Sequence, residues 1–187
     1  ALPGPLVDAS TLTMRDLEQM RDDLVPLVEE QAGRPFLTPP GVGMGETEEL
    51  MDLLEAESLE LLAQLYDAPD ALIEEMSRSS RESVGYILGK YGIQTNKVYL
   101  GLSALQGSFE VDDLPAEDRL DAACLILAHE LTHALQDQQA RHADRFANLR
   151  GNEGFEALRS ISEGHAVFVE ERVALAMDRM DLFWTLC

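Results

Sequence analysis

The chain has 187 residues, which is enough for one domain with a real hydrophobic core and too few for two large ones. It carries 35 Asp and Glu against 14 Lys and Arg, a formal net charge of −21, which excludes a surface that neutralises nucleic-acid phosphates. The longest apolar run, residues 122–128, is far shorter than the roughly 20 residues of a membrane span. We therefore expect a single domain, residues 1–187, that neither binds nucleic acid nor spans a membrane.

Residues 1–83 are predicted to form a helical N-terminal part of this domain. Thr13 and Asp16 resemble a capping box, and the apolar residues that follow at helical spacing predict a helix over 14–32 that ends at Gly33. The Pro- and Gly-rich stretch 35–45 predicts a loop. Two further amphipathic helices are then expected, over residues 46–66 and 69–82.

Residues 84–187 are predicted to combine a hairpin with two long helices. Two β-prone runs within 84–103 flank a Gly/Asn turn, which is typical of a short hairpin. The polar stretch 106–117 leads into a helix over 118–141, and a last long helix follows over 153–181. The expected fold class is α+β, mostly helical, with a small antiparallel sheet or hairpin before the helix of 118–141. In that helix Cys124 lies in an apolar run and is expected to be a buried free thiol.

All four histidines lie between positions 129 and 165, and two of them form an HExxH sequence, His129-Glu130-Leu131-Thr132-His133, inside a predicted helix. Residues four apart differ by only about 40° around a helix, so the two imidazoles can share one metal ion. Glu130 points about 100° away from His129, which suits a base for a metal-activated water better than a ligand. The motif therefore predicts Zn²⁺ held by His129 and His133, with Glu130 as the catalytic residue.

A catalytic zinc site needs a third protein ligand. The extended pattern HExxHxxGxxH fails at Gln136 and Gln139, so His142 is expected to be a solvated residue near the end of the helix. Two carboxylates on the last helix remain, Glu153 and Glu163. They lie about 15 Å apart along that helix, so only one of them can be the ligand.

The segment 129–137, HELTHALQD, resembles the active-site helix of gluzincins, the thermolysin-like zinc peptidases, in which a Glu on a following helix completes the site. The segment 163–170, EGHAVFVE, resembles the glutamate helix of the related M1-type aminopeptidases, whose pattern is EGxAxxxE. This resemblance covers about residues 124–172, implies a zincin-like fold and places the third ligand on Glu163. Glu153 has the spacing from His133 that is familiar in gluzincins, but it lacks the Ala and the final Glu of the pattern.

The chain also departs from the gluzincin pattern. Thermolysin-like enzymes carry an Asp four residues after the ligand Glu, where this chain has Val167, so Asp137 and Glu170 are the candidates to orient a histidine in its place. The His or Tyr that stabilises the oxyanion in such enzymes has no match here, and His165 and Tyr99 are the candidates.

Gluzincins place an antiparallel edge strand just before the HExxH helix, and a peptide substrate pairs with that strand. The resemblance predicts this strand at residues 97–102. The alternative is an ordinary edge strand without a role in substrate binding.

The predicted activity is zinc-dependent hydrolysis of a peptide bond in a peptide or protein substrate, with Glu130 as general base. Two alternatives remain: a zinc hydrolase of non-peptide amides or esters, and a zinc-binding structural or interaction domain without turnover. Substrate, oligomeric state and compartment stay open. The chain begins at Ala1 without a signal-type apolar stretch, which is compatible with export and earlier removal of a leader.

Overall fold

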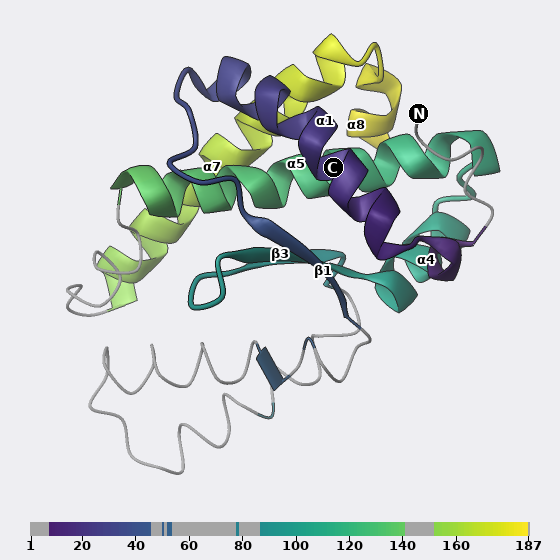
Figure 1. Cartoon of the computed structure of the whole chain (residues 1–187), viewed down its shortest axis with the longest axis horizontal. Coiled ribbons are helices and arrows are strands. Elements are labelled where there is room, and N and C mark those ends of the chain that lie inside the picture. Colours follow the sequence, from purple (N-terminus) through teal and green to yellow (C-terminus); the bar gives the residue numbers. More distant parts are fainter. Residues whose placement is uncertain are drawn as a thin grey trace.

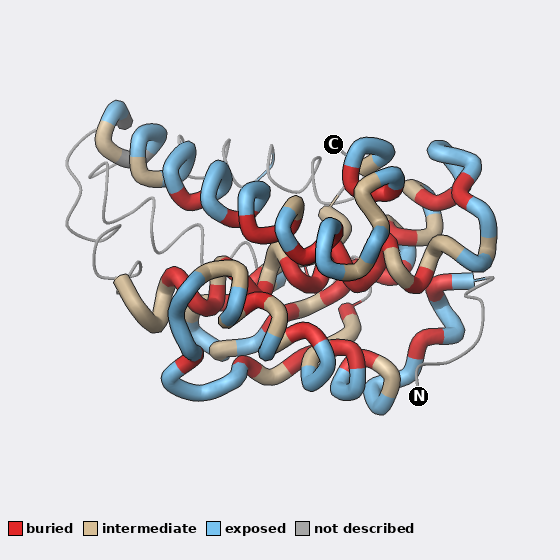
Figure 2. The backbone as a smooth tube through the Cα atoms, turned by 90° about the horizontal axis from the view of Figure 1, so that it is seen from above, coloured by how far each residue is buried: buried red, intermediate tan, exposed pale blue. Residues whose placement is uncertain are grey.

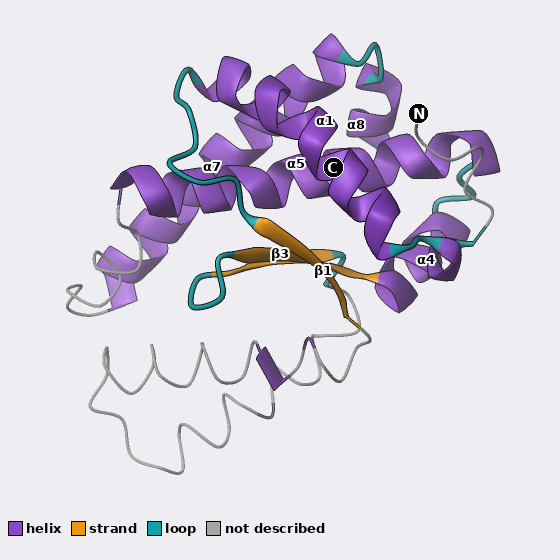
Figure 3. Ribbon diagram, in the orientation of Figure 1, coloured by secondary structure: helices purple, strands orange, loops and turns teal. Residues whose placement is uncertain are grey.

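The computed structural model confirms the α+β class: the chain is mostly helical, with a small three-stranded mixed sheet (Figure 3). The structure describes residues 8–45, 50, 52–53, 78, 87–140 and 152–186. Its elements are η1 (Ala9–Thr11), α1 (Met14–Ala32), β1 (Gly41–Gly45), β2 (Gly89–Gly92), β3 (Lys97–Gly101), α4 (Leu102–Val111), α5 (Ala116–Ala140), α7 (Asn152–Ala176) and α8 (Met180–Leu186).

Helix α5 lies at the centre of the fold, with the sheet on one side and α1, α7 and α8 on the other (Figure 1). All residues from Ala122 to Ala128 are buried, so this stretch of α5 is covered around its whole circumference. A helix that is apolar all round has to be enclosed, which explains why two layers sandwich it. The helix predicted over 118–141 is confirmed up to Ala140, where the described segment ends. Cys124 is buried and free, and burial raises the pKa of its thiol to about 12.

Helix α1 begins and ends where its sequence signals predict. Thr13 and Asp16 form both hydrogen bonds of the capping box, and Gly33 ends the helix in the left-handed conformation with φ 68°. One face of α1 packs into the core while the opposite face is exposed, and Figure 2 shows the same division on the other outer helices. The buried face consists of Leu17, Met20, Leu24 and Val28.

The sheet has the order β1-β3-β2, with β1 parallel and β2 antiparallel to β3. The predicted hairpin is confirmed as β2 and β3, and Asn96 in its turn has φ 48°. The loop predicted over 35–45 is wrong for residues 41–45, which form β1. Glycine acts there as a packing residue, because a Cβ on Gly43 would lie 2.7 Å from Cδ1 of Tyr99. Because β1 runs parallel to β3, the sheet is mixed and not purely antiparallel.

The prediction of an edge strand at 97–102 is also wrong. Strand β3 lies between β1 and β2 and is paired on both sides, so it has no free edge. Among the described strands, β1 and β2 form the edges. Leu102 already belongs to α4.

Two helical predictions need correction. The polar stretch predicted over 106–117 is helical up to Val111, because Leu102, Leu105 and Phe109 recur at helical spacing and bury one face of α4. The last helix, predicted over 153–181, is interrupted after Ala176 by a turn in which Asp178 has φ 59°.

The helices predicted over 46–66 and 69–82 lie outside the described residues, except for positions 50, 52, 53 and 78, which are helical. Most of the described buried apolar residues share one hydrophobic core. None of the described helices combines the length and the apolar character that crossing a bilayer requires.

Arg179 explains why the chain turns back between α7 and α8. Its guanidinium forms ion pairs with Asp118 and Asp121 on α5 and lies 3.6 Å from Asp181 at the start of α8. Only 17% of the Arg179 side chain is exposed, so these contacts are better shielded from solvent than an ordinary surface ion pair. Through these ion pairs, Arg179 links the segment just before α8 to the central helix α5.

Replacing Arg179 with Gln should lower the free energy of unfolding by about 1–3 kcal/mol, because Asp118 and Asp121 would lose a charged hydrogen-bond partner. Urea denaturation followed by circular dichroism measures this change. The control is Arg15→Gln, at an exposed position of α1, for which the expected change is within about 0.5 kcal/mol. Equal stability of the two variants would show that the Arg179 contacts contribute nothing.

Candidate metal centre

The two histidines of the HExxH motif converge as predicted. His129 and His133 lie one turn apart on α5, and their Nε2 atoms are 3.2 Å apart. Both side chains are largely buried, with 20% and 18% of their surface exposed. With Glu130 they form a group whose possible ligand atoms all lie within 4.8 Å of one another, so this group could hold a metal ion.

Hydrogen bonds at the other ring nitrogens fix which atoms are available to a metal. Nδ1 of His129 donates to Oε2 of Glu170 at 2.9 Å, and Nδ1 of His133 donates to Oε1 of Gln136 at 3.0 Å. In the neutral rings each Nε2 therefore presents a lone pair. Two lone pairs 3.2 Å apart repel each other, so the arrangement calls for a cation, either a proton or a metal ion, between or beside them.

Glu163 comes to this pair from α7, which packs against α5. Its Oε2 lies 3.4 Å from Nε2 of His129 and 3.4 Å from Nε2 of His133. The three atoms form a nearly equilateral triangle. Because zinc binds imidazole and carboxylate at about 2.0–2.2 Å in tetrahedral geometry, its ligand atoms are about 3.3 Å apart. The triangle thus has the size of one face of a zinc coordination tetrahedron.

The other third-ligand candidates are placed differently. Glu153 is exposed in the first turn of α7, and no described contact joins it to the histidines. His142 lies outside the described residues.

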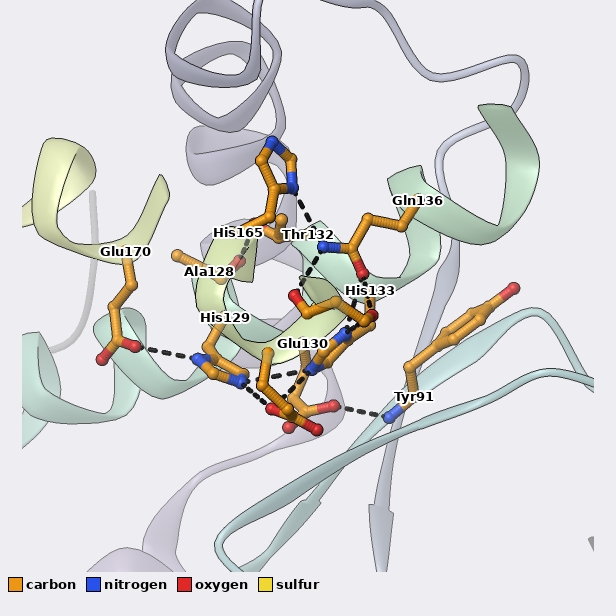
Figure 4. A network of polar contacts seen from close by, with 11 residues as sticks. Tyr91, Ala128, His129, Glu130, Thr132, His133, Gln136, His165 and Glu170 are labelled. Carbon is orange, nitrogen blue, oxygen red and sulfur yellow. Dashed lines mark hydrogen bonds and ion pairs between the residues drawn. The ribbon is translucent and has the colours of Figure 1, made fainter. Parts of the chain in front are cut away.

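Glu130 is oriented by the sheet. Its Oε2 accepts a hydrogen bond from the backbone N–H of Tyr91 in β2 at 2.7 Å, as Figure 4 shows. The strand can approach α5 this closely because Gly89 has no side chain: a Cβ there would lie 2.9 Å from Cγ of Glu130 and 3.2 Å from Cγ2 of Ile126. The carboxylate of Glu130 is therefore held beside the histidine pair by an edge strand.

Of the residues that hydrogen-bond to the two histidines, the sequence predicted one. Glu170 contacts His129 and is buried, so one of the two expected carboxylates is in place. The other, Asp137, accepts a hydrogen bond from the hydroxyl of Tyr91 at 3.1 Å. The role of Gln136 was missed, although its position three residues after His133 puts it on the same face of the helix.

Gln136 belongs to a small hydrogen-bond network behind His133. Ser162 Oγ donates to Gln136 Oε1 at 2.6 Å, while Gln136 Nε2 donates to the carbonyl of Ser162 at 2.8 Å and to Nδ1 of His165 at 2.9 Å. No sequence motif marks Ser162, because its partner lies on another helix.

The residues proposed to stabilise an oxyanion lie elsewhere. Figure 4 shows His165 beyond Gln136, on the side of His133 away from Glu130 and Tyr91. Tyr99 packs across the sheet against Gly43 and Gly92. In the described part of the chain, neither side chain contacts the Nε2 atoms of the histidine pair.

The charges at the centre shift one another's pKa values. Burial is the largest influence on His129 and lowers its pKa, but the contacts with Glu163 and Glu170 outweigh it and raise the pKa to about 10. Contacts with His129 and then His133 hold the pKa of Glu163 well below its usual range. Burial, followed by the nearby charges of Arg34 and His133, lowers the pKa of His165. A metal ion bound at the pair has to displace the proton that His129 retains.

Gly89→Ala should disturb Glu130, because the new methyl group would overlap its Cγ and press on Ile126. Overpacking of this kind is expected to cost about 1–3 kcal/mol in the free energy of unfolding, measured by urea denaturation. The matched control is Gly107→Ala in α4, where a Cβ would meet no atom within 4 Å and helix propensity favours Ala by up to about 1 kcal/mol. A Gly89→Ala protein as stable as the wild type would contradict the close approach of β2.

Comparisons of the chain with protein-family models, curated proteins and solved structures gave no match. The interpretation of this centre therefore depends on its own geometry.

Proposed function

We propose that this protein is a zinc-dependent peptidase of gluzincin type, with His129, His133 and Glu163 as zinc ligands and Glu130 as general base. The observation that carries the proposal is the triangle of Nε2, Nε2 and Oε2 atoms, with sides of 3.2, 3.4 and 3.4 Å, beside an oriented carboxylate. A zinc ion bound there would acidify a water molecule and polarise the carbonyl of the scissile bond.

The residues of the chain have separate tasks in this proposal. Glu170 and Gln136 each hold one imidazole so that its Nε2 faces the shared position. The N–H of Tyr91 holds Glu130, which takes a proton from the attacking water and passes it to the leaving amine.

The outward-facing backbone groups of strand β2 favour a peptide as the substrate over other amides and esters. The N–H of Tyr91 points away from β3, toward Glu130, so it lies on the outer edge of the strand. In an antiparallel strand the N–H and C=O of one residue face the same side, and alternate residues repeat that orientation. The carbonyls of Gly89 and Tyr91 thus face the edge beside Glu130, where an extended peptide can pair with them.

The alternative function, a zinc-binding domain without turnover, is favoured by one observation. Within the described residues, neither His165 nor Tyr99 lies where an oxyanion would form next to the histidine pair. Cleavage of a peptide library that stops on adding a chelator and returns with zinc supports the peptidase. Bound zinc without any cleavage supports the alternative.

Glu130→Gln separates metal binding from catalysis. The variant should retain one zinc ion per chain, because Glu130 is not a proposed ligand, while turnover should fall by about 10²–10⁴-fold with loss of the base. Zinc is measured by atomic emission after dialysis, and turnover by cleavage of the peptide library. Glu153→Gln, which changes an exposed carboxylate of α7, is the control and should cleave like the wild type. Unchanged cleavage by Glu130→Gln would refute its role as base.

The third ligand is tested by comparing Glu163→Ala with Glu153→Ala. Loss of a ligating carboxylate should weaken zinc binding by more than about a hundredfold, since loss of an outer-shell partner alone costs 10–100-fold. Competition with a fluorescent chelator measures this affinity, because two histidines alone can still retain some zinc. His133→Ala should abolish binding. If Glu153→Ala proves the damaging change and Glu163→Ala does not, Glu153 is the ligand.

A further inference from the structure

A cavity of about 320 Å³ lies next to the Gln136 network, between the end of α1, α5 and α7. Its aliphatic lining consists of Ala32, Leu135, Ala140 and Ile161. Its size lies at the lower end of the range for small-molecule pockets. The cavity borders Gln136 and His165. Figure 4 shows that His165 and Glu130 lie on opposite sides of His133. The cavity is therefore separate from the face at which a peptide would meet the proposed metal centre.

Among the described residues that line this cavity, Arg34 is the charged one, and none is an Asp or Glu. The Arg34 side chain is exposed, and within the described part of the chain no carboxylate lies within ion-pairing distance of it. This is unusual in a protein with 35 acidic against 14 basic residues. Guanidinium groups bind carboxylates through paired N–H donors, so an anion is the ligand that Arg34 would accept.

His165 adds a second donor at the same cavity. The amide of Gln136 has a fixed orientation, because its Nε2 donates to the carbonyl of Ser162. That Nε2 also donates to Nδ1 of His165, which must therefore be unprotonated. The proton of the neutral ring is then on Nε2 of His165, which can donate a hydrogen bond to a ligand in the cavity.

We propose that this cavity binds a small carboxylate with an aliphatic body. The carboxylate pairs with Arg34 and Nε2 of His165, and the aliphatic part packs against Leu135 and Ile161. A phosphate ester fits less well, because one guanidinium and one imidazole leave most of its oxygens without donors beside an aliphatic lining. Two sources carry the required chemistry: a free short-chain fatty acid and the C-terminal residue of a peptide that ends in an aliphatic side chain.

The test is isothermal titration of the metal-free protein with hexanoate and with N-acetylleucine, which represent these two sources. Metal-free protein is used so that coordination of the carboxylate by zinc cannot imitate binding, and the result does not depend on the proposed peptidase. At least one probe should bind saturably, and the tighter one identifies the source. Hexanamide, which has nearly the same shape without the charge, should bind at least about tenfold more weakly.

Arg34→Gln should weaken binding of the carboxylate at least about tenfold, and Arg34→Lys should restore part of it. Arg34 is exposed, so these variants should fold like the wild type. Arg15→Gln is the matched control, because Arg15 lies on α1 about 25 Å from Ala32 along the helix, and its affinity should be unchanged. Failure of both probes to bind at millimolar concentration overturns the proposal. Equal affinities of Arg34→Gln and wild type do so as well.

Discussion

The arrangement of the whole structure depends on the burial of α5. Its middle, Ala122–Ala128, is covered on every side, and only two packed layers can achieve this for a helix of its length. The HExxH motif begins at His129, where this apolar stretch ends. The same packing that buries the middle of α5 therefore brings α7 to one side of the motif and β2 to the other. Each layer contributes polar groups to the candidate metal centre.

Some groups of the candidate metal centre are positioned by the local geometry of one helix, and others by the packing of distant segments. The convergence of His129 and His133 is a property of any α-helix and needs no tertiary structure. The positions of Glu163 and Glu170 depend on the packing of α7 against α5, and that of Glu130 depends on β2. Helix α7 supplies Glu163 and Glu170, and β2 supplies the N–H that binds Glu130. The geometry of the candidate metal centre therefore depends on both layers.

This difference explains what could be predicted from the sequence. The helical spacing of the histidines and the EGxAxxxE pattern at Glu163 were sufficient to place three groups that the structure brings together. Tyr91 could not be found in this way, because it contributes a backbone N–H that any residue except Pro would supply. Ser162 was missed because its partner, Gln136, is distant in sequence.

The errors in the fold have similar physical causes. Strand β1 was predicted as part of a loop because the stretch 35–45 is rich in Pro and Gly, whereas the glycines of β1 make room for the side chains of β3. Helix α4 was overlooked because only Leu102, Leu105 and Phe109 form its apolar face, among polar neighbours. The end of α7 depends on ion pairs from Arg179 to α5, which involve residues far upstream.

The use of a main-chain donor at Tyr91 also bears on how this protein tolerates variation. A hydrogen bond from a side chain disappears with one substitution, whereas the N–H at position 91 survives every replacement except proline. Side-chain changes at this position would remove the hydroxyl contact with Asp137 and leave the carboxylate of Glu130 with its donor. The hydrogen bond to Glu130 therefore does not depend on the identity of the side chain at position 91, whereas the core packing of the buried Tyr91 ring does. The orientation of Glu130 is vulnerable at Gly89, where the smallest possible addition already meets an occupied space.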